Sequence, residues 1–128
     1  MAKRQVLEVP GLPGHGTNPI PNAIKIGNLV FTGSIAGHDP ETHQAPDEPD
    51  RQVALAFASL KRVVEAAGGT TDDIAKIDVY LKDMALRAVV NEEWVKMFPD
   101  AANRPVRHAT RLDLPGNLVI QLQMIAVL

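Results

Sequence analysis

The order of hydrophobic and polar residues divides the chain into short alternating stretches and two longer stretches with helical spacing. Alternation, in which every second residue is apolar, predicts a strand with one buried face. We expect strands over residues 6–9, 23–26, 29–36, 74–82, 106–112 and 118–127. Gly27-Asn28 separates the second from the third, and it favours a tight hairpin because both residue types accept the positive φ angles of such turns.

Two stretches repeat apolar residues at steps of three and four, which predicts helices that each bury one face. The stripe of the first comprises Val53, Ala56, Phe57, Leu60, Val63, Val64 and Ala67, and it stops at Gly68-Gly69. The second covers residues 84–98 and ends before Pro99. Thr71 or Asp72 is expected to cap the turn before the fourth strand, whose buried side should carry Ala75, Ile77, Val79 and Leu81.

The resulting order of elements is β, ββ, α, β, α, ββ, with no internal repeat. It predicts an α+β fold in which two helices pack on one face of a mixed sheet. The chain has 128 residues and a mass of 13.8 kDa, so we interpret residues 1–128 as one domain. Hydrophobic residues make up 45% and charged residues 22%, which excludes a disordered protein.

The last strand has two unlike faces. One carries the apolar row Leu118, Ile120, Leu122 and Met124, and the other carries Val119, Gln121, Gln123, Ile125 and Val127. The second row is too apolar for water and too polar for a closed core. We therefore expect another copy of the chain to cover it, which makes the protein a homo-oligomer.

Charge and composition narrow the class of ligand. A formal charge of −2 and a pI near 6.0 provide no general attraction for phosphate backbones. The only basic cluster is Arg104, Arg107, His108 and Arg111, and it has no stacking aromatics beside it, so nucleic acid is not expected as a partner. The four histidines show no metal-ligand spacing, and neither a metal nor a cofactor is expected.

The chain has no cysteine, which excludes disulfides and thiolate chemistry. Residues 1–10 lack the apolar run of a secretory signal, and no stretch has the length of a membrane span. We expect a cytoplasmic protein that does not associate with membranes.

The pair Arg107 and Gln121, which we expect on adjacent strands, is the best candidate for chemistry. An arginine fork holds a carboxylate through two charge-assisted hydrogen bonds. A glutamine can orient a water but cannot accept its proton as a glutamate would. Together they predict a site for a small anionic ligand. His108 adjoins Arg107 but should point to the opposite face of its strand, so we do not assign it as a base.

Several segments within residues 19–127 resemble the reactive intermediate deaminase family, also called Rid/YjgF and formerly L-PSP endoribonuclease. The segments are Ile26 to Ile35, Gln52 to Gly68, Ile77 to Met84, Val90-Asn91-Glu92, Pro105-Val106-Arg107, Leu114-Pro115-Gly116 and Ile120-Gln121-Leu122. The resemblance implies a chorismate-mutase-like subunit in a homotrimer with ligand clefts between subunits. It also implies an enamine/imine deaminase, in which the arginine matching Arg107 holds a small carboxylate substrate and a water attacks the imine carbon.

The resemblance further implies that Asn91 lies near the cleft and that Gly33 and Ser34 line it. Three positions depart from the family pattern. Ile20 falls where deaminating members often have tyrosine, Ala109 where many have cysteine, and Gln121 where the signature has glutamate. Two other functions therefore stay open: a small-carboxylate (2-oxo acid) binding protein without turnover and, more weakly, the endoribonuclease of the older family name.

Overall fold

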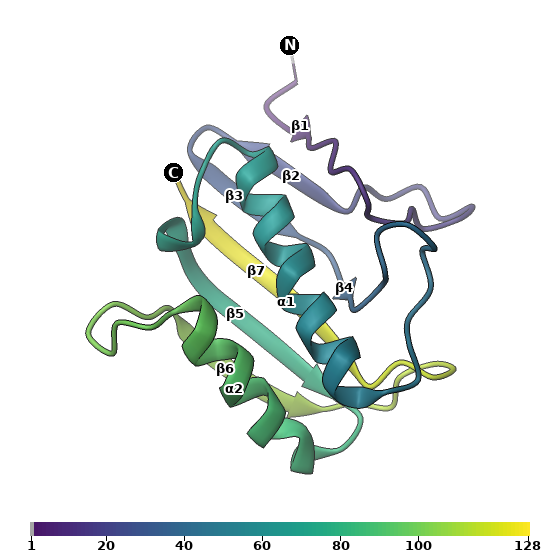
Figure 1. The fold of residues 1–128 in the computed structure, drawn as a ribbon. Coiled ribbons are helices and arrows are strands. Elements are labelled where there is room, and N and C mark those ends of the chain that lie inside the picture. Colours follow the sequence, from purple (N-terminus) through teal and green to yellow (C-terminus); the bar gives the residue numbers. More distant parts are fainter. Residues whose placement is uncertain (1) are drawn as a thin grey trace.

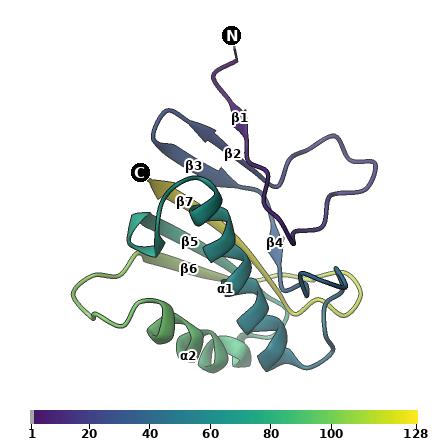
Figure 2. The same cartoon turned by 45° about the horizontal axis from the view of Figure 1, so that its top comes forward.

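The computed structural model describes residues 2–128, so Met1 of the expected domain lies outside this range. One mixed seven-stranded sheet has both α-helices on one side (Figures 1 and 2). The strands are β1 (Gln5–Val6), β2 (Ala23–Ile26), β3 (Leu29–Thr32), β4 (Ile35–Ala36), β5 (Ile74–Leu81), β6 (Val106–Arg111) and β7 (Ile120–Val127). This architecture confirms the expected α+β fold. Within the described residues, no helix has the length and apolar character needed to cross a membrane.

Strand β7 lies at the centre of the sheet. It pairs antiparallel with β3 and β4 on one side and with β5 on the other. Beyond β5 lies β6, which runs parallel to it because the chain returns through a helical crossover. The chain neighbours β6 and β7 are therefore separated by β5.

The helical elements are α1 (Pro49–Ala66), η1 (Thr71–Asp73), η2 (Met84–Leu86) and α2 (Arg87–Met97). The apolar stripe expected for the first helix is buried as predicted. Helix α1 starts at Pro49, so a proline lies in its first turn, where a missing N–H costs nothing. The second expected helix is divided into η2 and α2.

Two expectations about the extent of strands in this part of the sheet were wrong. The first strand is confined to Gln5–Val6, and Leu7 continues as a loop whose side chain still packs against the core. The stretch 29–36 is interrupted at Gly33 and Ser34. At this interruption the Thr32 hydroxyl accepts a hydrogen bond of 2.9 Å from the Met124 N–H of β7. A side chain thus replaces the ladder bond that the break removes.

The start of β5 also differs from the expectation. A register shift between Ile74 and Lys76 turns Ala75 outward, so Ile74 takes the buried position that alternation assigned to Ala75. The cap before β5 is Thr70, one residue earlier than expected. Its side chain and that of Asp73 bond each other's backbone N–H in a capping box.

A buried glutamine joins the start of α1 to two loops. The Gln52 Nε2 donates hydrogen bonds to the carbonyl oxygens of Pro46 (2.9 Å) and Asn117 (3.0 Å), and its Oε1 accepts one from the Val119 N–H (2.6 Å). Gly37 packs directly on this residue, because a Cβ there would lie 1.9 Å from the Gln52 carbonyl oxygen. This contact fixes the chain just after β4.

Replacing Gln52 by alanine is expected to lower the free energy of unfolding by about 3 kcal/mol, because the buried Val119 N–H and two carbonyls lose their partner. Urea denaturation followed by circular dichroism measures this change. Gln44→Ala serves as the control, since Gln44 is exposed in the neighbouring loop. Equal midpoints for the two variants would contradict the importance of these bonds.

Candidate functional site

The side of β7 that faces away from the helices carries the half-polar row expected from the sequence. Ile120, Leu122, Met124 and Ala126 are buried in the core, whereas Gln121, Gln123 and Ile125 are half-buried. Beside this row, next to β4, lies a pocket of about 440 Å³, which we call the Gln121 pocket. Its polar lining comprises His15, Asn18, Asn22, Ser34, His38 and Gln121.

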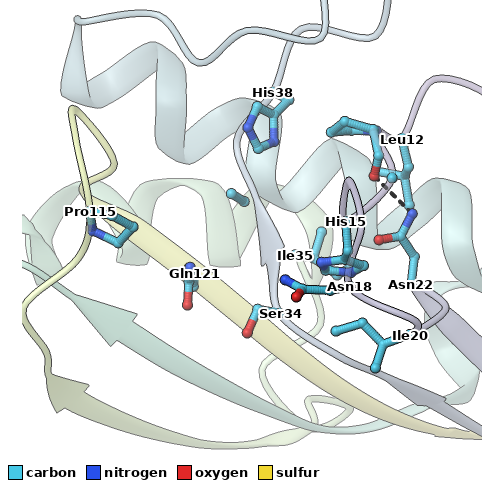
Figure 3. A pocket seen from close by; sticks show the side chains of 13 residues that line it. Leu12, His15, Asn18, Ile20, Asn22, Ser34, Ile35, His38, Pro115 and Gln121 are labelled. Carbon is cyan, nitrogen blue, oxygen red and sulfur yellow. Dashed lines mark hydrogen bonds between the residues drawn. The ribbon is translucent and has the colours of Figure 1, made fainter.

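Figure 3 shows how the pocket is arranged: Gln121 and Ser34 lie between Pro115 on one side and His15 and Asn18 on the other, with His38 above them. The loop that forms one wall is held to the sheet. The Asn22 Nδ2 donates to the Pro13 carbonyl (3.0 Å), and the Gly33 N–H donates to the Asn22 carbonyl (2.9 Å). These two hydrogen bonds fix the backbone of the loop before β2, which forms this wall of the pocket.

Ile20 and Gly33 lie near Ser34, at the edge of the Gln121 pocket. Ile20 borders the Gln121 pocket and is 56% exposed. Ile20 and Gly33 also line an adjoining, largely apolar hollow with Phe31. A rim this apolar and this exposed is the kind of surface that proteins cover with another chain.

Two histidines of the pocket were missed by sequence reasoning. His38 is half-buried in the pocket wall. Burial, and secondarily the charge of His43, lower the pKa of His38 below its ordinary value of 6.5. The Nε2 of His15 is buried and has no hydrogen-bond partner within residues 2–128. No local sequence signal places His38 here, because its position follows from strand pairing: Ala36 pairs with Gln121, and His38 follows two residues later.

Arg107 lies on the helix side of the sheet, at its edge. Its Nη2 donates a hydrogen bond of 2.8 Å to the Asn91 Oδ1 of α2, and its guanidinium lies 4.9 Å from the centre of the Trp94 ring. Burial, and then the nearby Arg87, lower the pKa of Arg107, although an arginine keeps its charge at any working pH. Ala109 follows on the same face of β6.

Within the described part of the chain, no acidic side chain neutralises this guanidinium. The ion pairs formed among residues 2–128 join Arg51 to Asp39, Lys76 to Asp78 and Lys96 to Glu93, and none includes Arg107. Asn91 orients this half-buried cation and Arg87 repels it, so binding an anion would stabilise it. The arrangement can hold a carboxylate.

The expectation that Arg107 and Gln121 occupy adjacent strands was wrong. They lie on β6 and β7, with β5 between them. They also face opposite sides of the sheet, because Arg107 contacts α2 while Gln121 alternates with residues packed beneath the helices. One subunit therefore cannot bring both side chains to one small ligand.

The placement of His108 is as expected. It pairs with Asp78 on the side of the sheet away from the helices, whereas Arg107 pairs with the buried Ile77. The basic cluster is dispersed as well, since the Arg104 Nε donates to the Phe98 carbonyl at the end of α2. Neither His108 nor the dispersed arginines form a surface on which nucleic-acid bases could stack.

Comparison with known proteins adds to this geometry. The family model described as Endoribonuclease L-PSP matches residues 16–128. The chain belongs to the Rid/YjgF family. A 2-iminobutanoate/2-iminopropanoate deaminase of Escherichia coli K12 is 30% identical to this Rid protein over 111 residues, covering 85% of this chain and 87% of the relative.

Two solved structures show the same Rid fold. RidA from the Antarctic bacterium Psychrobacter sp. PAMC 21119 is 30% identical with a TM-score of 0.87, and 97% of this chain and 99% of that chain are covered. TdcF of E. coli with bound serine is 27% identical with a TM-score of 0.86, covering 96% and 98%. The family thus includes a deaminase and a protein that binds a small amino acid.

Proposed function

We propose that this Rid protein hydrolyses small 2-imino carboxylates, or their enamine tautomers, to 2-oxo acids and ammonia. The observation that carries the proposal is the unneutralised, half-buried Arg107, which Asn91 and Trp94 orient at the sheet edge. A carboxylate supplies the missing anion through two parallel charge-assisted hydrogen bonds. The name of the deaminase relative supports an imine as the group next to that carboxylate.

The opposite placement of Arg107 and Gln121 supports a cleft made by two copies of the chain. One copy would contribute Arg107, Asn91 and Ala109, and the next would contribute Gln121 with Ser34, Gly33 and Ile20. Because each copy would use different surfaces toward its two neighbours, the contact would be heterologous, and such a contact forms a ring when the rotation between copies closes. We propose the homotrimer, which gives three such clefts.

In this cleft Arg107 holds the substrate carboxylate and fixes the imine carbon against the Gln121 pocket. The Gln121 amide and the Ser34 hydroxyl orient a water for attack on that carbon. Water adds to the C=N bond to give a carbinolamine. The C–N bond then breaks, ammonia leaves, and the carbonyl of the 2-oxo acid remains.

The test follows imine hydrolysis directly. An amino acid oxidase generates imines from several amino acids, a nucleophilic trap reports the imine that survives, and added protein should lower the trapped amount. Wild type and Gln121→Glu are compared side by side. Turnover by wild type supports the proposal. If neither wild type nor Gln121→Glu accelerates the loss of imine, the proposal is refuted.

A second candidate function rests on Gln121 itself, since an amide cannot serve as a base. In that case the cleft binds a small carboxylate, such as a 2-oxo acid, without turnover. Wild type would then bind 2-oxobutanoate in calorimetry yet leave imines intact, and Gln121→Glu would gain hydrolysis. This pattern separates a binding protein from a deaminase.

Assembly has its own measurement. Sedimentation velocity at micromolar concentration is expected to give a single species of about three subunit masses. Replacing Ile20 at the apolar rim by aspartate should shift this species toward monomer, because a charge would be buried in the contact. Thr17→Asp, an exposed change in the same loop, is the control. Monomer alone in wild type would contradict the shared cleft.

A further inference from the structure

The Gln121 pocket contains two imidazoles that the function proposed above does not use. His38 and His15 both line it, together with Gln121 and Ser34, and His15 lies across the pocket from Pro115 (Figure 3). His15 presents a buried Nε2 with no hydrogen-bond partner within residues 2–128. They are the only titratable side chains lining this pocket in the described part of the chain.

The backbone fixes where His38 stands. Ala36 of β4 is the ladder partner of Gln121, and the chain continues from there through Gly37. Gly37 admits no side chain because the Gln52 backbone presses on it, and Gln52 is itself held by three hydrogen bonds. The backbone that carries the His38 side chain is thus held in place next to β7, the strand that carries Gln121.

Hydrolysis of an imine needs a group that removes a proton from water as its oxygen attacks carbon. Such a base contributes about 10² to 10⁴ in rate. An uncharged imidazole is the side chain best suited to this task near neutral pH, and an amide cannot perform it. The lining of the pocket therefore contains an amide and also a group with the basicity that the amide lacks.

We propose that His38 is the general base of this cleft, taking the part that the Gln121 amide cannot fill. This inference rests on the proposed imine hydrolysis. The His38 ring accepts a proton from the water that Gln121 and Ser34 orient, while the water oxygen bonds to the iminium carbon and the C=N pair moves to nitrogen. The imidazolium then returns the proton to that nitrogen, and the C–N bond breaks as an oxygen lone pair forms the C=O bond of the 2-oxo acid. His38 takes up the hydroxyl proton and passes it to the departing ammonia, which leaves as ammonium.

The surroundings of His38 keep it uncharged and able to accept a proton. Burial and the charge of His43 in the same loop lower its pKa. His15 lines the same pocket from the N-terminal loop, and the adjacent Asp39 is paired with Arg51 at 3.3 Å. Turnover should therefore fall as pH drops through a value below 6.5, where His38 becomes protonated.

The first test is the pH profile of imine hydrolysis by wild type, His38→Asn and His43→Asn. His38→Asn is expected to lower kcat about 10²-fold with KM retained, and the acidic limb should disappear. His43→Asn should retain turnover and move that limb to higher pH, since a charge that lowers the pKa of His38 is gone. Asparagine also tolerates the positive φ of 60° at position 43.

Two further variants separate chemistry from structure. Added imidazole should restore turnover to His38→Ala in proportion to its concentration, which a structural defect would not permit. Gln121→Glu should restore turnover to His38→Asn, because the new carboxylate lies in the same pocket. A His38→Asn protein with the kcat and acidic limb of wild type would overturn this inference while leaving the proposed function intact. Imines untouched by both wild type and Gln121→Glu would overturn both.

Discussion

Arg107→Ala is expected to lower kcat/KM for 2-imino acids about 10³-fold, because two charge-assisted hydrogen bonds to the substrate carboxylate are lost together. The change removes the positioning of the imine as well as its binding, so kcat should fall and KM should rise. Steady-state kinetics with imines generated in situ measure both constants. The fold should survive, since the Trp94 contact of a partly exposed arginine contributes only about 1 kcal/mol.

Two controls accompany this variant. Arg107→Lys keeps the cation but loses the planar fork, so it should lie between wild type and alanine. Arg104→Ala removes a cation three residues away that is bonded to the Phe98 carbonyl, and it should leave kcat/KM close to wild type. An Arg107→Ala protein with the kinetics of Arg104→Ala would exclude Arg107 as the carboxylate anchor.

Mixing two damaged proteins is expected to recover activity. Arg107→Ala spoils one half of the proposed cleft, and Gln121→Leu spoils the other half by removing the amide. In a ring assembled at random from equal amounts, about a quarter of the clefts receive an intact half from each variant. The mixture should therefore show about a quarter of the wild-type rate, although each variant alone is nearly silent. Activity is measured after joint unfolding and refolding.

The control for mixing combines both changes in one chain. The doubly substituted protein, unfolded and refolded alone in the same way, contains no intact cleft and should show no activity. If the two single variants together give only the sum of their separate rates, Arg107 and Gln121 do not meet across a subunit boundary.

The patterns that predicted this fold are local, and their failures come from non-local contacts. The alternation of β7 and the stripe of α1 correctly identified buried positions, because burial of one face dictates them. The outward turn of Ala75 depends on the register shift against β7, which no local pattern records.

The sequence could suggest candidate residues for the site but not their arrangement. Arg107 and Gln121 could be named from their chemistry and from the family resemblance. Their separation could not, because the parallel crossover inserts β5 between two strands that are consecutive along the chain. His38 stayed hidden for a related reason, since its position next to Gln121 follows from the pairing of β4 with β7.

The placement of Arg107 and Gln121 on opposite sides of one sheet has a thermodynamic consequence. A ligand that contacts both must bridge two copies, so its binding free energy and the association free energy of the subunits become linked. By mass action, substrate favours the assembled form, and dilution weakens the apparent affinity for substrate. For such a protein, the substrate concentration and the protein concentration both shift the equilibrium between separate and assembled subunits.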